Sequence, residues 1–199
     1  MNIVLATENL HKKEELSSIF LDHSLFIPKD LGLSFDFEED APTFLGNSLG
    51  KAQTLWDVVR ERAGSEPLAV LADDSGLVVP SLGGEPGIYS ARYGSDVYGH
   101  MLESSERNRY LLSKLEGITD RRAFFVCCMT CILDDYTIYT VQETMKGAII
   151  DKEYGHGGFG YDPIFFVDTY GKTVAQLKAE EKNRISHRGK AGAKLARLL

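Results

Sequence analysis

Two adjacent carboxylates and a hydroxyl follow a short apolar run, a pattern that favours binding of a hard metal ion. Asp73, Asp74 and Ser75 come directly after residues 68–72, which read as a buried strand. In α/β sheets, ligands bind beyond the carboxyl ends of strands, and Mg2+ prefers carboxylate oxygens. Because consecutive strand residues face opposite sides, we expect Asp73 and Asp74 to differ in role. A polar β-turn is the alternative interpretation, since Asp, Ser and Gly all favour turns.

A second acidic group lies at Asp36, Glu38, Glu39 and Asp40. Glu39 is the member most compatible with a divalent metal site. The alternative is a solvated strand end followed by a helix N-terminus, where carboxylates are favourable in any case. The sequence alone hardly separates the two.

The first strand-to-helix turn could hold an anion. Thr7 and Asn9 offer polar side chains there, Lys12 and Lys13 follow, and a helix N-terminus presents free N–H groups. An ordinary helix N-cap with surface lysines is the alternative. Glu8 argues against a phosphate site unless its side chain points away or holds a metal.

A glycine-rich loop and a basic segment could recognise a planar, oxygen-bearing ligand. Residues 155–160 match G-x-G-x-x-G, but a turn and a strand follow them, which excludes the dinucleotide-binding fingerprint. Phe159 could stack on a base from this loop, or could pack in the core. Further along, Lys182, His187 and Arg188 offer hydrogen-bond donors for keto or phosphate oxygens, or simply begin a basic helix.

The cysteines indicate packing rather than chemistry. Cys128 and Cys131 spell C-x-x-C within a β-rich run, so we expect the two thiols to face opposite sides. Three cysteines cannot all pair within one chain, and no signal peptide is evident at the N-terminus. We therefore expect reduced thiols and a cytoplasmic location.

Alternating helices and strands early in the chain, followed by hairpins, predict an α/β fold with a mixed sheet. Strands are predicted at 2–6, 34–38, 68–72 (resuming at 77–79 after a break at 73–76), 121–133, 136–150 and 163–167. Helices are predicted from Asn9, from the Asp40/Pro42 start signal to about Arg62, at 104–116 and from about 186. Asp134-Asp135 is predicted to form a hairpin turn.

Composition narrows the function classes. The chain has 199 residues, is 43% hydrophobic and 26% charged, and carries a net charge of -7. These values predict one globular domain, 1–199, or two packed lobes, and they exclude a disordered chain. No apolar run approaches the length of a membrane helix. An acidic chain is not a general nucleic-acid binder, but residues 178–199 carry +5, which suits a small anionic ligand.

Six motifs in order extend over nearly the whole chain, and together they resemble the inosine/xanthosine triphosphate pyrophosphatases. The motifs are Ala6-Thr7-Glu8-Asn9 with Lys12, Glu38-Glu39 through Thr43-Phe44 and Asn47 to Lys51-Ala52, Ala72–Leu77, Leu82-Gly83-Gly84 with Pro86–Arg92, Gly157–Pro163, and Glu181-Lys182 with Ile185–Arg188. The chain has Glu8 where the family usually has Gly, and Gly46 where it usually has Glu.

The resemblance implies an enzyme that removes deaminated purine nucleotides from the nucleotide pool. ITP, dITP and XTP would be hydrolysed to the monophosphate and pyrophosphate with Mg2+. The family's fold implies an elongated mixed sheet with flanking helices, two lobes around a central cleft, and a homodimer. No membrane or nucleic-acid partner is implied.

The resemblance also implies roles for individual residues. Asp73 and Asp74 are expected to be catalytic, with Asp74 as proton acceptor, and Glu39 and Asp74 are expected to hold the metal. The expected substrate-binding residues are Thr7, Asn9, Lys12, Ser75, Phe159, Gly160, Tyr161, Asp162, Lys182, His187 and Arg188. Because of Glu8 and Gly46, a non-catalytic nucleotide-binding or regulatory protein is a second hypothesis. A pyrophosphatase for other modified nucleotides is a third.

Overall fold

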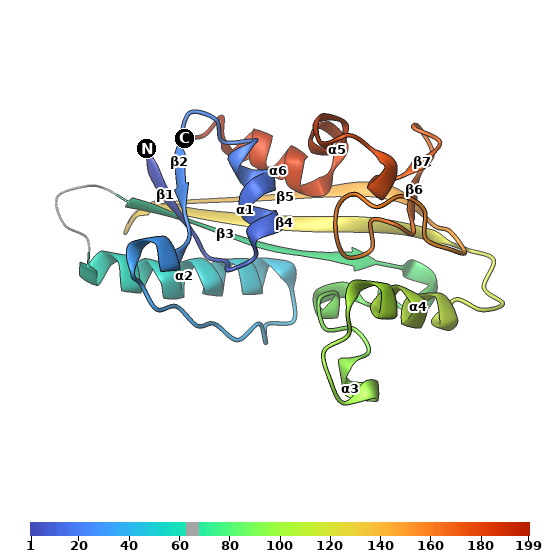
Figure 1. Cartoon of the computed structure of the whole chain (residues 1–199). Coiled ribbons are helices and arrows are strands. Elements are labelled where there is room, and N and C mark those ends of the chain that lie inside the picture. Colours follow the sequence, from blue (N-terminus) through green and yellow to red (C-terminus); the bar gives the residue numbers. More distant parts are fainter. Residues whose placement is uncertain (63–67) are drawn as a thin grey trace. The chain divides into compact units, whose positions relative to one another are not determined.

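The computed structural model describes residues 1–62 and 68–199, and these contain a mixed seven-stranded sheet (Figure 1). The strand order is β2-β1-β3-β4-β5-β6-β7. β1 pairs in parallel with β2 and β3, whereas β6 pairs antiparallel with β5 and β7. The strands are β1 (Asn2–Leu5), β2 (Ser24–Phe26), β3 (Leu68–Val78), β4 (Arg122–Asp134), β5 (Thr137–Ile149), β6 (Phe165–Val167) and β7 (Lys172–Thr173).

Helices flank this sheet, which confirms the predicted α/β class. They are α1 (Leu10–Ser17), α2 (Phe44–Arg62), α3 (Ser95–Tyr98), α4 (Ser104–Lys114), α5 (Ala179–Ile185) and α6 (His187–Leu195). Within the described ranges, no helix combines the length and apolar character of a bilayer-spanning segment.

The chain forms two compact units, and unit 1 comprises Met1–Asp74, Cys127–Glu143 and His187–Leu199. Its part of the sheet is covered on both faces (Figure 1). On one face, Leu16 and Phe20 beside α1 and Leu195 of α6 pack against β1, β3 and β4. On the other face, Leu55 and Val59 of α2 pack against the same strands. Burial on both faces explains why β1 and the first half of β3 are almost wholly apolar.

Unit 2 comprises Ser75–Val126 and Thr144–Ser186, and it has one core. Leu111 of α4 and Leu115, the C-cap residue of that helix, pack there with Phe125 of β4, Phe165 of β6 and Ile164. The spacing of the two leucines matches the predicted helix at 104–116, which ends near Gly117 with its left-handed backbone.

Two sequence predictions about strands are wrong. Residues 34–38 form no strand, although their side chains alternate between exposed and half-buried. The alternation arises because an extended segment lies along unit 1, with Phe35 packed on the α2-side core, but without a partner strand. The break predicted at residues 73–76 is also absent, since β3 runs through it to Val78. Tertiary contacts of the two aspartates, described below, override the turn preference of the Asp-Asp-Ser-Gly sequence.

The long elements were predicted well, and the short ones less so. α2, the hairpin formed by β4 and β5, and the chain's last helix lie where expected. The start of α2 is later than predicted, at Phe44, because Thr43 rather than Asp40 accepts a hydrogen bond from a first-turn amide, that of Gly46 (3.0 Å). The three-residue β2 was not predicted.

Candidate active site

The two adjacent aspartates lie where β3 continues beyond its parallel neighbour. β1 pairs with β3 only as far as Leu5, opposite Leu71, and the Ala6 amide adds one more hydrogen bond to the Leu71 carbonyl (2.8 Å). Asp73 and Asp74 are therefore part of β3, but they lie just beyond the level at which the neighbouring strand β1 ends. Their side chains contact different helices on the two faces of unit 1, as the strand alternation predicted.

Asp74 belongs to a polar group on the α2 side, the Asp74 group, formed by Glu39, Asn47, Lys51 and Asp74. Asn47 is fully buried, and its Nδ2 donates to Asp74 Oδ2 (3.1 Å) while its Oδ1 accepts from the Ala41 amide (3.0 Å). Lys51 lies one turn further along α2 and forms an ion pair with Glu39. Two side chains of one helix thus hold the two carboxylates that were predicted to bind metal.

The environment of Asp74 changes its acidity. Burial raises the pKa of the Asp74 carboxyl from its ordinary 3.8 to about 6, and the negative charge of Glu39 adds to this. Lys51, the hydrogen bond from Asn47 and Lys12 oppose the increase in pKa. A carboxyl with a pKa near 6 is a far better proton acceptor at neutral pH than an ordinary aspartate.

Two glycines of α2 allow the segment that carries Glu39 to pack closely against this helix. A Cβ on Gly46 would lie 2.8 Å from the Ala41 Cβ, and a Cβ on Gly50 would lie 2.8 Å from Phe37 Cζ. Both distances are shorter than real Cβ contacts, so a side chain at position 46 would displace the backbone that carries Ala41, whereas one at position 50 would displace the Phe37 ring. Gly46, where the resembling family has Glu, is therefore a packing requirement in this chain.

The donor set of the Asp74 group fits Mg2+. Within the described residues, no group of three His, Cys, Asp or Glu side chains is arranged to hold a metal ion. Mg2+ does not need such a cage, because it usually binds one or two carboxylates together with substrate phosphates and water. Asp74 and Glu39 supply two carboxylates of this kind.

Asp73 lies in a separate cluster on the other face, the Asp73 cluster, formed by Lys12, Glu15, Asp73, Cys127 and Arg188. Arg188 Nε donates to Asp73 Oδ2 (2.9 Å), and its Nη1 donates to Glu15 Oε2 (2.7 Å). Lys12 forms an ion pair with Asp73 Oδ1, and the Cys127 thiol lies 3.4 Å from Oδ2. The Asp73 side chain is only 2% exposed, so its charge is balanced by cations inside the protein.

Arg188 is more deeply buried than its predicted role suggested. Burial alone would lower the pKa of its guanidinium, but Asp73 and Glu15 outweigh that effect and raise it. The structure therefore brings Arg188 together with Asp73 and Lys12 in unit 1. The sequence analysis expected Arg188 to bind substrate together with Phe159, Asp162 and Lys182. Those three residues belong to unit 2.

The first strand-to-helix turn adopts the N-cap geometry that sequence offered as an alternative. Asn9 Oδ1 accepts from the amides of His11 (3.0 Å) and Lys12 (3.3 Å), and Thr7 Oγ1 accepts from the Asn9 amide (3.1 Å). No described residue other than glycine has a positive φ, so Glu8 sits in an ordinary backbone conformation and its side chain is exposed. The glycine that the family usually has here is not needed to form this turn.

In unit 2, Phe159, Asp162 and Lys182 form a second polar site, the Phe159 group. Lys182 Nζ donates to Asp162 Oδ2 (2.7 Å) and lies 4.9 Å from the centre of the Phe159 ring. The Phe159 amide donates to the same carboxylate oxygen (3.0 Å). Phe159 belongs to none of the hydrophobic core clusters of the described residues and is half-buried.

Gly158 and Tyr161 explain how this loop keeps its shape. Gly158 has φ +71°, and a Cβ there would lie 2.0 Å from Asp162 Oδ2, so only glycine fits. The Tyr161 hydroxyl donates to the Ser90 carbonyl (2.9 Å), and burial raises the pKa of this phenol. Gly160, which precedes Tyr161, also has a positive φ (+62°), but a Cβ there would have no neighbour within 4 Å.

Comparison with known proteins identifies the family. The sequence model of the Ham1 family matches residues 3–198. The chain belongs to the Ham1 family. It is 47% identical over 199 residues to the dITP/XTP pyrophosphatase of Treponema denticola, covering 100% of this chain and 98% of that protein. It is 40% identical to the dITP/XTP pyrophosphatase of Clostridium tetani, covering 94% and 90%.

Solved structures of Ham1 proteins have the same fold. The Ham1 protein of Staphylococcus aureus superposes with a TM-score of 0.82 at 40% identity, covering 100% of this chain and 97% of that one. The HAM1 protein of Coxiella burnetii gives a TM-score of 0.83 at 33% identity, covering 100% and 98%.

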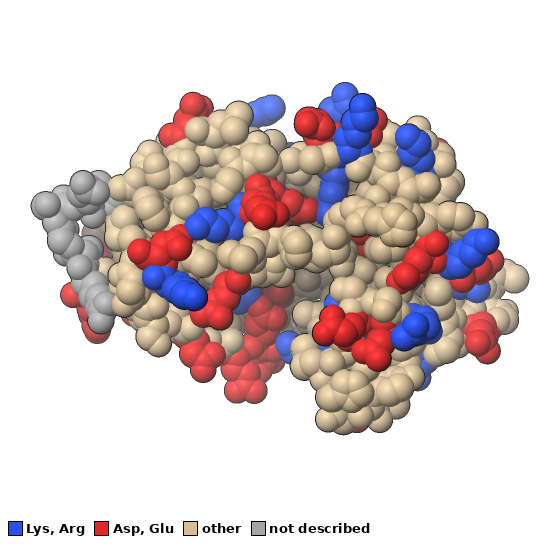
Figure 2. Space-filling view, viewed as in Figure 1, with Lys and Arg blue, Asp and Glu red and all other residues tan. Residues whose placement is uncertain are grey.

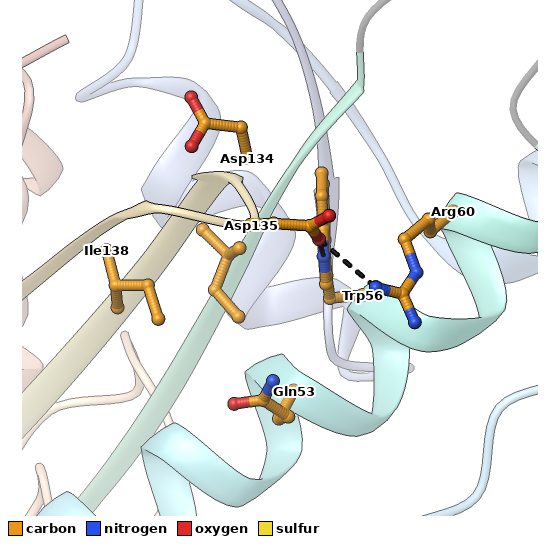
Figure 3. Close-up of a pocket in the computed structure, with 7 residues that line it drawn as sticks. Gln53, Trp56, Arg60, Asp134, Asp135 and Ile138 are labelled. Atoms are coloured by element: carbon orange, nitrogen blue, oxygen red, sulfur yellow. Dashed lines mark hydrogen bonds and ion pairs between the residues drawn. The ribbon is translucent and has the colours of Figure 1, made fainter.

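Not every carboxylate pair in this Ham1-family chain belongs to a candidate site. Asp134 and Asp135 lie in the predicted hairpin turn and line a pocket of about 310 Å3 in unit 1 (Figure 3). Asp134 accepts from the Tyr136 amide (2.8 Å), and Asp135 accepts from Trp56 Nε1 (3.0 Å) and Arg60 (3.2 Å). The Trp56 hydrogen bond lowers the pKa of Asp135, the opposite of the change at Asp74.

Two predicted site residues have not yet been placed, and three residues of the site were not predicted to have a role. Ser75 follows Asp74 in β3, and His187 is buried at the start of α6. Asn47 and Lys51 were part of the family motifs but were assigned no role. Cys127 was not expected to contact an aspartate, and no signal in the sequence indicated that contact.

Proposed function

We propose that this chain hydrolyses the deaminated purine nucleotides ITP, dITP and XTP to the nucleoside monophosphate and pyrophosphate. The observation that carries the proposal is the buried Asp74 carboxyl, held by Asn47 beside Glu39 and Lys51. Support also comes from relatives that are named dITP/XTP pyrophosphatases and match the chain over its full length.

Asp74 acts as the proton acceptor for the attacking water. The water oxygen bonds to phosphorus, the bond from phosphorus to the bridging oxygen breaks, pyrophosphate leaves, and the water proton moves to Asp74. Asn47 Nδ2 donates a hydrogen bond to Oδ2 of Asp74 (3.1 Å). The fixed amide also prevents the carboxyl from rotating away from the reacting water.

Lysines and a metal ion offset the negative charge of the phosphates. Lys51 stands beside Asp74 in unit 1, and Lys12 is held at the end of β1 by Asp73. Asp74 and Glu39 would hold Mg2+, which supplies positive charge for the phosphate oxygens and activates water. Preorganised cations of this kind account for most of the catalysis in phosphoryl transfer.

Asp73 is a positioning residue in this proposal, whereas the family resemblance of the sequence implied a catalytic role for it. Its carboxylate is buried and already neutralised by Lys12 and Arg188, so it is a poor base and a poor metal ligand. It keeps the Lys12 ammonium at the N-terminal end of α1, where the phosphates would bind.

The Phe159 group recognises the purine base. Phe159 stacks on the ring, and the Lys182 ammonium, held by Asp162, donates to the 6-keto oxygen. A 6-amino group, as in adenine, would place a donor against a donor, and such a polar mismatch rejects a substrate strongly.

The protein acts as a cytoplasmic homodimer in this proposal. Reduced, buried cysteines suit that compartment, and Cys127, Cys128 and Cys131 are all buried thiols outside any disulfide. Unit 2 exposes large apolar side chains that suit a contact with a second copy, and sedimentation velocity tests for the dimer. They are Tyr89, Val97, Tyr98 and Met101.

Substrate screening tests the function. With Mg2+, we expect kcat/KM for ITP, dITP and XTP to exceed the value for ATP at least about a hundredfold, as a polar mismatch at the 6-position implies. Equal turnover of ATP would contradict the proposal. Binding of ITP without turnover of any nucleotide would favour a regulatory protein instead.

A further inference from the structure

One buried polar side chain of unit 2 contacts both ends of the glycine-rich loop. Asn108 lies on α4, is 1% exposed, and its Nδ2 donates to Glu153 Oε1 (2.7 Å) and to the Gly160 carbonyl (3.2 Å). Glu153 precedes the loop, and Gly160 directly follows Phe159. A single amide group therefore ties together the two ends of the segment that carries the stacking ring.

The position of Asn108 on its helix makes this contact unusual. Residues 108, 111 and 115 share one face of α4, and Leu111 and Leu115 are core residues of unit 2. An apolar side chain would be expected at position 108 from this spacing. Within the part of the chain that the structure describes, Asn108 Oδ1 has no hydrogen-bond partner, which is unfavourable in a core. The two donor contacts are the feature that distinguishes asparagine from leucine here.

Both groups that face Asn108 Nδ2 are acceptors, one a carboxylate and the other a carbonyl. The orientation of the amide is therefore fixed by chemistry, because its oxygen in that place would face two other oxygens. An aspartate of the same shape would repel both neighbours. Asparagine is required for its donor, not only for its size.

The loop between these two contacts has little stiffness of its own. It contains Gly155, Gly157 and Gly158, and two of these have positive φ. Other hydrogen bonds also hold it. The Tyr154 amide donates to the Pro163 carbonyl (2.9 Å), Thr173 Oγ1 donates to the Tyr154 carbonyl (2.6 Å), and the amides of Gly157 and Phe159 donate to the Ala175 carbonyl (3.0 Å) and to Asp162 (3.0 Å). Glycine-rich backbone keeps one conformation only where outside contacts hold it.

We propose that Asn108 is a specificity-positioning residue, which sets the place of the Phe159 ring and the Asp162–Lys182 pair by clamping Glu153 to Gly160. This inference rests on the proposed function, because it assigns the clamp to recognition of the base. Asn108 acts through the loop and does not itself touch the substrate.

The test uses Asn108→Asp, which keeps the shape and replaces the donor with an acceptor. We expect the preference for ITP over ATP, as the ratio of the two kcat/KM values, to fall about tenfold, since a part-buried charge-assisted hydrogen bond is lost. The loss should lie in a higher KM for ITP, with a smaller change in kcat. Ser105→Asp, which adds the same charge at an exposed position of α4, should keep the wild-type ratio.

A second substitution separates positioning from folding. In the double variant Asn108→Asp with Glu153→Gln, the new glutamine can donate to the new aspartate, so we expect part of the ITP preference to return. Glu153→Gln alone should keep the wild-type ratio, because its oxygen can still accept from Asn108.

The outcomes distinguish the clamp from the proposed function. If the wild type hydrolyses no deaminated nucleotide, the proposed function fails. If the wild type prefers ITP but Asn108→Asp keeps that ratio, or lowers both rates in proportion together with the melting temperature, then Asn108 is only structural and the inference is overturned. A lowered ratio that Glu153→Gln restores supports it.

Discussion

Replacing Asp74 with Asn should stabilise the protein while removing its activity. Asn has the same shape, and its Oδ1 can still accept the hydrogen bond from Asn47, so the packing of unit 1 is kept. The substitution removes a buried carboxylate whose ionised form is disfavoured by burial and by Glu39.

The size of the effect follows from the pKa. Below pH 3.8 the Asp74 carboxyl is protonated in both the folded and the unfolded chain, so its ionisation does not affect the free energy of unfolding. Between about pH 4 and pH 6 only the unfolded chain ionises, since the folded pKa is about 6, and the stability of the wild type falls as pH rises. Above that range the full effect, about 3 kcal/mol at 1.36 kcal/mol per pH unit, is present.

Chemical and thermal denaturation without divalent metal, between pH 4 and pH 8, measures this effect. At pH 7.5 the Asp74→Asn variant should melt about 5–10 °C above the wild type, and at pH 4 the difference should vanish. The rate of ITP hydrolysis should fall at least about a hundredfold, as expected for loss of a general base.

Asp135→Asn is the matched control, because hydrogen bonds lower the pKa of Asp135 and its charge is favourable in the fold (Figure 3). That variant should be unchanged or less stable above pH 4. An Asp74→Asn protein that is destabilised at pH 7.5, or that keeps wild-type turnover, would refute the reasoning.

Two further substitutions test the clusters around the site. Asp73→Asn leaves Lys12 and Arg188 without their buried carboxylate, so the free energy of unfolding should fall by about 3–5 kcal/mol in urea denaturation. An unchanged free energy of unfolding would show that the Asp73 cluster does not contribute to stability. Gly158→Ala places a methyl group against Asp162, so KM for ITP should rise well above that of Gly160→Ala, which also has positive φ but open space around it; equal KM values for the two variants would contradict the packing argument.

Local patterns in the sequence predicted the long elements because their signals are local. The apolar spacing of α2 and α4, the apolar run of β4 and the alternation in β5 are visible within about fifteen residues. Strand alternation also predicted that Cys128 and Cys131 would face opposite sides, and the structure confirms this, since Cys131 packs on the α1 side while Cys128 does not belong to that cluster.

The errors arose where distant residues decide the structure. Asp73-Asp74-Ser75-Gly76 has the composition of a turn, yet it continues β3 because Asp73 pairs with Lys12 and with Arg188, which lies 115 positions away in the sequence. No local pattern contains that contact. The extended segment at 34–38 was mistaken for a strand because burial on one face produces alternation with or without a partner strand.

The candidate site was predictable in its residue types and not in its electrostatics. The family motifs pointed to Asp73 and Asp74 together, but only the structure gives them opposite environments: one carboxylate neutralised by two cations, the other buried beside a second carboxylate. The distribution of surface charge does not locate the candidate site, since Figure 2 shows acidic and basic side chains intermingled on the visible face.

The most direct test of the central claim is the identity of the products released from ITP. In the presence of Mg2+, 31P NMR of the reaction should show inosine monophosphate and pyrophosphate in equal amounts from the first turnover, with no orthophosphate and no diphosphate nucleotide. Release of orthophosphate with inosine diphosphate would mean that the terminal phosphate is attacked, and would contradict the account.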